Sequence, residues 1–208
     1  EFGASIVIGD AIFDLDMDIY APCALGATVN PNTISRLKCK IIAFSSGGKI
    51  QEFCVKNNIK HKTVSKFHSP RATFTSYLYT ILKVLHNTLN IKEEDILESI
   101  EKLNELNKKI SSSNLTDTNP AINLAKWITS IPIIYYPFGL QSAAIRFKNS
   151  LQENSKMHAM SEDVIEACHN GIVSWEKISN VLPILIRGSE DNIKTKERWE
   201  IIKEFFYE

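Results

Sequence analysis

The amino-acid sequence predicts an α/β fold in two units, each with parallel strands flanked by helices, the first unit being shortened. Short runs rich in Ile and Val alternate with longer helical patterns, which is typical of parallel sheets joined by helical crossovers. A polar segment over residues 108–120 interrupts this alternation. Residues 11–38 hold one short strand pattern and a Pro/Gly/Asn loop. That is lean for a doubly wound sheet, which cycles strand and helix every ~30 residues.

The predicted strands are short, β-branched and bounded by Gly, Pro or Ser. They cover residues 4–9, 39–45, 60–65, 131–137 and 182–188. The predicted helices show apolar residues at helical spacing, as Phe74, Leu78, Leu82 and Leu85 do. These helices cover residues 47–57, 71–90, 93–112, 140–153 and 193–206.

The polar segment marks the expected boundary between the units. We expect a first unit over residues 1–112, a connection over 113–118 and a second unit over 119–208. Asn119 and Pro120 suit the N-cap and the first position of a helix that opens the second unit.

Composition excludes several function classes. Lys plus Arg and Asp plus Glu are both 24, so zero net charge gives no reason to expect nucleic acid as a partner. No stretch approaches the ~20 apolar residues that span a bilayer, and no signal peptide is visible. The four cysteines form no zinc-type spacing, and the histidines form no ligand pattern, so we expect no metal site. Buried thiols in a reducing cytosol explain the cysteines, and we expect a cytoplasmic protein.

Two glycine-bearing stretches are candidates for anion binding. In "FSSGGKIQEF", Ser45, Ser46, Gly47 and Gly48 lie between a predicted strand and helix, where free N–H groups favour a phosphate. A turn without a ligand explains the stretch equally well. In "FGASIVIGD", Ser5 beside Gly3 is a weaker case of the same kind.

Three charged or titratable side chains are candidate catalytic groups. Arg71 opens a helix, where the dipole disfavours a cation, so it serves either a functional role or a nearby carboxylate. Glu153 ends an apolar-periodic helix and suits a base, unless it is a solvated helix-end residue. His169 suits proton transfer near neutral pH, although a lone histidine is more often structural.

Residues 16–43 resemble part of the nucleotide-binding domain of the glutamate/leucine/phenylalanine dehydrogenases, with an "APCA" turn after a strand. The chain has no G-x-G-x-x-G turn followed by an acidic residue ~20 positions on, and no catalytic-lysine segment of that family. Without a pyrophosphate cradle, hydride transfer is not expected.

Several motifs, in the same order, resemble the bifunctional phosphoglucose/phosphomannose isomerases, which contain two sugar-isomerase (SIS) domains. They are "GASIVIGDAI", "IIAFSSGGKIQEF", "SPRATFTSYLYTILKVL", "NPAINLAKWI", "IPIIYYP", "RFKNSLQENSKMHA" and "EACHNGIVSWE". The resemblance implies two SIS-type units and the interconversion of aldose and ketose phosphates through an enediol. It implies a homodimer that acts on a sugar phosphate without a cofactor or metal.

The same resemblance implies roles for the candidate residues. Glu153 would move the proton, His169 would assist ring opening, and Arg71 would stabilise the enediolate. Ser5 stands where the family has a serine near the phosphate, and Ser45, Ser46, Gly47 and Gly48 border the same crevice.

The chain also departs from the family pattern. "GATVNPNTIS" stands in place of the family's Ser-Tyr-Ser-Gly-Asn-Thr phosphate loop, and the family continues beyond Glu208 with a lysine and a threonine of the active site. We therefore expect an incomplete first unit and a C-terminally truncated second unit. A non-catalytic sugar-phosphate-binding module and an inactive fragment or chimera are the alternatives to an active isomerase.

Overall fold

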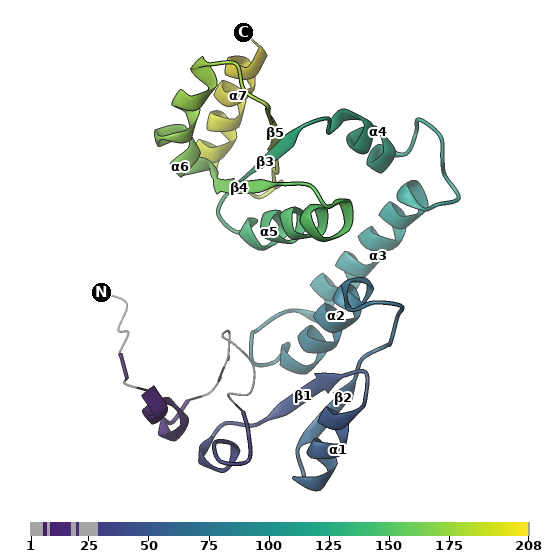
Figure 1. Cartoon of the computed structure of the whole chain (residues 1–208), viewed down its shortest axis with the longest axis vertical. Coiled ribbons are helices and arrows are strands. Elements are labelled where there is room, and N and C mark those ends of the chain that lie inside the picture. Colours follow the sequence, from purple (N-terminus) through teal and green to yellow (C-terminus); the bar gives the residue numbers. More distant parts are fainter. Residues whose placement is uncertain (1–5, 8, 18–19, 21–28, 208) are drawn as a thin grey trace. The chain divides into compact units, whose positions relative to one another are not determined.

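A computed structural model describes residues 6–7, 9–17, 20 and 29–207 of the chain (Figure 1). The chain divides into two compact units, Glu1–Lys102 and Leu103–Glu208. The division falls inside helix α3 (Glu93–Ile110), which lies just ahead of the polar segment. Both units contain parallel strands and helices, so the predicted α/β class with parallel sheets is confirmed.

The first unit contains a two-stranded parallel sheet. Strand β1 (Ile42–Ser45) pairs with β2 (Lys60–Thr63), and helix α1 (Lys49–Lys56) connects them. Beyond the last pair, the Val64 N–H donates to the Ser45 carbonyl at 2.9 Å. This β1–α1–β2 arrangement places the chain that follows each strand at the same carboxyl edge.

The described part of the N-terminal region folds as two short 3₁₀ helices, η1 (Gly9–Asp14) and η2 (Ile34–Arg36). The strand predicted over residues 4–9 is wrong for Ile6, Val7 and Gly9, because Gly9 begins η1. Arg36 joins the two 3₁₀ helices through an ion pair with Asp14 at 2.7 Å.

The predicted helix over 71–90 is shorter than expected. It begins as the 3₁₀ helix η3 (Pro70–Thr73), continues as α2 (Phe74–Leu85), and ends in turns in which the Thr88 N–H donates to the Leu85 carbonyl at 2.9 Å. Asn90 has a φ of 50°, which a continuing helix does not tolerate. Helix α3 follows at Glu93, as predicted.

The second unit begins with α4 (Pro120–Trp127), and its predicted cap is confirmed. The Asn119 side-chain oxygen accepts hydrogen bonds from the N–H groups of Ala121 at 2.9 Å and Ile122 at 3.3 Å. Pro120 needs no such partner because it lacks an N–H.

The sheet of the second unit has the strand order β4–β3–β5, with all pairs parallel. Its strands are β3 (Ile131–Tyr136), β4 (Met160–Asp163) and β5 (Val181–Leu185). The connecting helices are α5 (Gln141–Ser150) and α6 (Val164–His169), then the 3₁₀ helix η5 (Gly171–Glu176), and α7 (Ile193–Tyr207) closes the unit. The sequence did not predict β4, whose residues Met-Ser-Glu-Asp lack a β-branched run.

The chain order places α5 and α6 on opposite faces of this sheet. The crossover from β3 to β4 and the crossover from β4 to β5 run in opposite directions, and both are expected to be right-handed. Figure 1 shows α6 beside α7, with α5 apart from them near β4. The hydrophobic core lies between the sheet and the α6/α7 pair, where Tyr135, Val164, Ala167, Trp199 and Ile202 are buried.

Polar groups at the margins of this core are paired. The Trp175 indole N–H donates to the Tyr135 hydroxyl at 3.0 Å, and the Trp199 indole N–H donates to Asp191 at 3.1 Å. Both aromatic rings can therefore lie in the core without leaving an unsatisfied donor. Among the described helices, none has the length and apolar composition that crossing a bilayer requires.

Candidate active site

The Ser45–Gly48 turn connects β1 to α1, as the sequence predicted. Gly47 has a φ of 121° and Gly48 a φ of 74°, values that favour glycine. Gly48 caps α1 without a side-chain hydrogen bond to the first helical N–H groups. The turn therefore combines close backbone approach with N–H groups at a helix start, the arrangement that binds anions in many proteins.

His61 is a neighbour of this turn that the sequence analysis did not include. Its Nε2 lies 2.7 Å from Ser45 Oγ, and the Gly47 N–H donates to the same oxygen at 3.2 Å. Ser45 is buried, with 7% of its surface exposed. The pairing of β1 with β2 would have indicated this contact. In the parallel register His61 lies opposite Ala43, so its imidazole ring lies beside Ser45, which follows Ala43 by two residues on the same strand.

Arg71 lies in η3, in the segment that follows β2. This segment leaves the sheet at the carboxyl edge of β2, the edge that also carries Ser45. Arg71 is exposed, and it belongs to the same unit as the Ser45–Gly48 turn. Ser5, the remaining predicted phosphate contact, lies outside the described residues.

Glu153 lies in a π-helical turn, Leu151–Ser155, that continues α5. Lys156 ends this turn with a left-handed φ of 57°, and its ammonium group donates to the Glu153 carbonyl at 2.6 Å. The Gln152 side chain also holds the turn, because its amide N–H donates to the Ala159 carbonyl at 3.2 Å. Single π turns are rare and occur frequently at functional sites, and this one presents Glu153 exposed to solvent.

His169 is the last residue of α6 and is exposed. The next residue, Asn170, hydrogen-bonds through its side chain to the Glu166 carboxylate, which holds the helix end. Because α5 and α6 each return from the carboxyl edge to the amino edge of the sheet, Glu153 and His169 both lie toward the amino edge. The predicted groups are thus divided, with Arg71 and the Ser45–Gly48 turn in the first unit and Glu153 and His169 in the second.

Burial changes the acidity of three groups in the second unit. It raises the pKa of Glu162, and the nearby carboxylates of Glu166 and Asp163 raise it further. Burial also raises the pKa of Tyr135, against the opposing effect of the Trp175 hydrogen bond, and the pKa of Cys168. Of these groups, the sequence analysis considered only the cysteine, as one of four thiols expected to be buried, and Cys168 is half-buried. No group of three or more His, Cys, Asp or Glu in the described residues could hold a metal ion.

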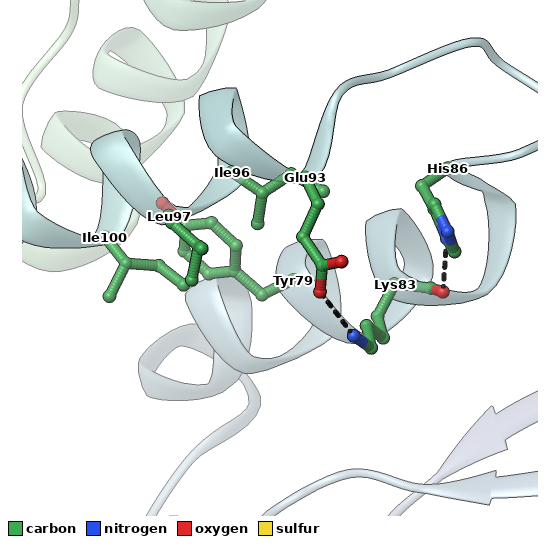
Figure 2. Close-up of a pocket in the computed structure, with 7 residues that line it drawn as sticks. All are labelled: Tyr79, Lys83, His86, Glu93, Ile96, Leu97 and Ile100. Atoms are coloured by element: carbon green, nitrogen blue, oxygen red, sulfur yellow. Dashed lines mark hydrogen bonds and ion pairs between the residues drawn. The ribbon is translucent and has the colours of Figure 1, made fainter.

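One cavity of the first unit lies between α2 and α3 and has a volume of about 260 Å³. Figure 2 shows its apolar side, formed by Ile96, Leu97 and Ile100, and the Lys83–Glu93 ion pair of 2.8 Å at its end. Lys83 lowers the pKa of Glu93 by this contact. None of the predicted site residues lines this cavity.

The described part of the second unit has several cavities, two of which contact different parts of the sheet. One, of about 320 Å³, lies at the carboxyl ends of β3 and β4, where parallel α/β sheets commonly bind ligands. It is lined by Tyr136, Phe138, Gly139, Gln141, Ser142 and Asp163. The other, of about 270 Å³, lies between the sheet and η5 and includes Tyr135, Glu162 and Trp175.

A parallel β4–β3–β5 sheet flanked by helices is consistent with an SIS domain. Residues 117–208 match the family described as the bacterial phospho-glucose isomerase C-terminal SIS domain. Residues 117–208 of the second unit are therefore similar in sequence to this family of domains.

Curated relatives extend the similarity into the first unit. Over 175 residues, the chain is 30% identical to a bifunctional phosphoglucose/phosphomannose isomerase of Caldicellulosiruptor bescii, a match that covers 79% of this chain and 51% of that protein. This finding and the family match confirm the predicted resemblance. The chain thus spans about half the length of this isomerase.

The resemblance to dehydrogenases is also confirmed. A stretch of 52 residues is 54% identical to the leucine dehydrogenase of Thermoactinomyces intermedius and 56% identical to that of Bacillus cereus. It covers 25% of this chain and 14% of each of these proteins. One chain therefore carries two unrelated similarities, a short one to an amino-acid dehydrogenase and a long one to a sugar-phosphate isomerase.

Proposed function

We propose that the protein interconverts aldose and ketose hexose 6-phosphates, with glucose 6-phosphate or mannose 6-phosphate giving fructose 6-phosphate through an enediol. The observation that carries the proposal is the family match over residues 117–208, which includes both Glu153 and His169. The long similarity to a bifunctional isomerase supports it, because it covers 79% of the chain.

Each candidate residue has a role in this reaction. Glu153 transfers a proton between C1 and C2 of the open-chain sugar, and His169 assists ring opening. Arg71 stabilises the negative charge of the enediolate with a guanidinium group that remains charged at any working pH. The Ser45–Gly48 turn and Ser5 hold the phosphate, and the free N–H groups at the start of α1 support this role.

The proposal includes the setting of the reaction. The protein acts as a homodimer in the cytoplasm and needs neither a metal nor a cofactor, because proton transfer to and from carbon uses side chains alone. Light scattering of the purified chain tests the dimer.

The test of the isomerase is the substitution Glu153→Gln. In an assay that follows fructose 6-phosphate formation, we expect turnover to fall about 10²–10⁴-fold, which is the usual contribution of a general base. Glu190→Gln removes the same charge from an exposed loop and is expected to leave turnover unchanged. Equal turnover of the two variants, or no turnover by the unaltered chain at high concentration, would contradict the proposal.

A thermal-shift measurement separates catalysis from binding. A ligand that binds only the native state raises the unfolding midpoint. Stabilisation by millimolar fructose 6-phosphate without turnover would identify a sugar-phosphate-binding module. If the chain shows neither stabilisation nor turnover, we would conclude that it is a fragment that does not bind this sugar phosphate.

A further inference from the structure

The cavity between the second unit's sheet and η5 has a lining that the proposed isomerase reaction does not use. Successive residues of a strand point to opposite faces, and the in-register pairs Ile133–Met160 and Tyr135–Glu162 lie on the same face. Val181 of β5 and Gly171, Ser174, Trp175 and Ser179 from the η5 region complete the lining. The cavity has a volume of about 270 Å³, enough for a small organic molecule.

Glu162 is the charged group of this cavity. Its side chain is half-buried, and within the described part of the chain its carboxylate accepts no hydrogen bond and forms no ion pair. A half-buried carboxylate without a partner is unfavourable, since the lost hydration is not replaced. By contrast, Asp163 caps α6 by accepting from the Ile165 N–H at 2.8 Å, and Glu166 holds Asn170.

Gly171 leaves room for this carboxylate. A Cβ atom at residue 171 would lie 2.9 Å from Glu162 Oε2 and 3.4 Å from Oε1. Real Cβ atoms essentially never approach another atom as closely as 2.9 Å, so a side chain there would displace the carboxylate. Glycine at this position therefore keeps the carboxylate in contact with the cavity.

The charges around Glu162 favour a cation. The neighbouring groups that influence its ionisation are the carboxylates Glu166 and Asp163, and both repel a second negative charge. A cationic ligand would pair with Glu162 and be attracted to the other two carboxylates. Since only one carboxylate faces the cavity, the lining suits a single hydrogen-bonding cation better than a metal ion.

The remaining lining favours an organic cation with an apolar part. Ile133, Met160 and Val181 provide an apolar surface, and Tyr135 and Trp175 provide aromatic rings. The hydrogen bond of 3.0 Å between the Trp175 indole N–H and the Tyr135 hydroxyl fixes these two rings relative to each other. Aromatic faces attract ammonium groups, most strongly where water is excluded.

We propose that this cavity binds a small primary ammonium ion carrying an apolar or aromatic group, with Glu162 pairing with the ammonium and Tyr135, Trp175 and the apolar residues contacting the remainder. None of the predicted catalytic groups lines this cavity, and the proposal does not depend on isomerase activity.

The test uses phenethylammonium as the probe, with calorimetry on the full chain at pH 8. Neutral 2-phenylethanol and anionic phenylacetate have similar shapes and serve as ligand controls. We expect saturable binding of phenethylammonium and at least about tenfold weaker binding of both controls, because a hydrogen bond to a charged partner is lost. Equal binding of the ammonium and the alcohol, or no ammonium binding at millimolar concentration, would overturn the proposal.

Two variants test whether the ligand binds in this cavity. Glu162→Gln removes the charge and keeps the shape, and we expect it to weaken phenethylammonium binding about tenfold or more. Gly171→Ala displaces the carboxylate, and we expect a loss in the same direction. Glu176→Gln removes a carboxylate from the exposed end of η5 and should leave binding unchanged. If Glu162→Gln and Gly171→Ala bind phenethylammonium as the unaltered chain does, the proposal is wrong.

Discussion

The two units use the same strand–helix–strand connection but differ in what they bury. In the first unit, the buried apolar residues of the described part are Phe13, Cys54 and Val64, around a two-stranded sheet. In the second, a three-stranded sheet and two helices enclose a core with Tyr135 and Trp199. Since burial of apolar surface is the main stabilising contribution to folding, we infer that the second unit is the more stable.

This difference also applies to the candidate residues, which are divided between the two units. Glu153 and His169 belong to the unit with the larger core, which also matches the isomerase domain family. The Ser45–Gly48 turn and Arg71 belong to the unit with the smaller core. Measurements that report on each unit separately can therefore test whether the two groups of candidate residues lie in units of unequal stability.

The largest expected effect is that of Trp199→Ala. Trp199 is 1% exposed in the core of the second unit, and removing a buried tryptophan costs about 3–5 kcal/mol in the free energy of unfolding. The three tryptophans of the chain all lie in the second unit, so denaturant unfolding followed by tryptophan fluorescence reports on it. Trp127→Ala, at a side chain that is 47% exposed, is the matched control and should cost about 0.5 kcal/mol.

A smaller effect is expected for Val64→Ala in the first unit. Val64 is 1% exposed and follows β2 directly, and the loss of its buried methyl groups should cost about 2 kcal/mol. Hydrogen exchange of the β1 and β2 amides measures this loss, and the tryptophan transition should stay in place. If the tryptophan transition shifted by the same free energy as the hydrogen exchange, the two units would unfold together. That result would contradict the inference that the units differ in stability.

The cap of α4 is expected to contribute about 1 kcal/mol. Asn119→Ala removes the oxygen that accepts from the Ala121 and Ile122 N–H groups. Asn119→Asp keeps this acceptor but loses the Nδ2 donor that bonds the Asn114 carbonyl at 2.8 Å, so it should recover only part of the lost stability. Both variants are measured by the tryptophan transition, and identical midpoints for the two would show that the cap contributes nothing.

The smallest effect is a pH-dependent one at Glu162. The pKa of Glu162 is higher in the folded state than in the unfolded state, so ionisation of this carboxyl destabilises the fold. The destabilisation is complete above the folded-state pKa, and it is absent below the unfolded-state pKa of about 4.3. Glu162→Gln should therefore be more stable than the unaltered chain at neutral pH and equally stable below about pH 4. Unfolding midpoints across this range measure the difference, and a constant difference at every pH would contradict this account.

The sequence predicted much of the fold because local signals and tertiary structure agree at those places. Asn119–Pro120 opens α4, the Ile-rich run over 131–137 becomes β3, and "FSSGGK" forms the turn between β1 and α1. The predictions were wrong where the local signals and the tertiary structure disagree. Residues 4–9 have a strand pattern, but Ile6, Val7 and Gly9 form no strand, and β4 forms from polar residues because β3 offers it a partner.

The sequence by itself determined the α/β class, the order of most elements and the family resemblance, because these depend on periodicity, capping and ordered motifs. Only the tertiary structure decided which side chains meet. Strand register places His61 beside Ser45, and it places Glu162 beside Tyr135, where Gly171 from a later segment leaves it room. Contacts between residues distant in sequence arise from register and packing, which a linear pattern does not specify.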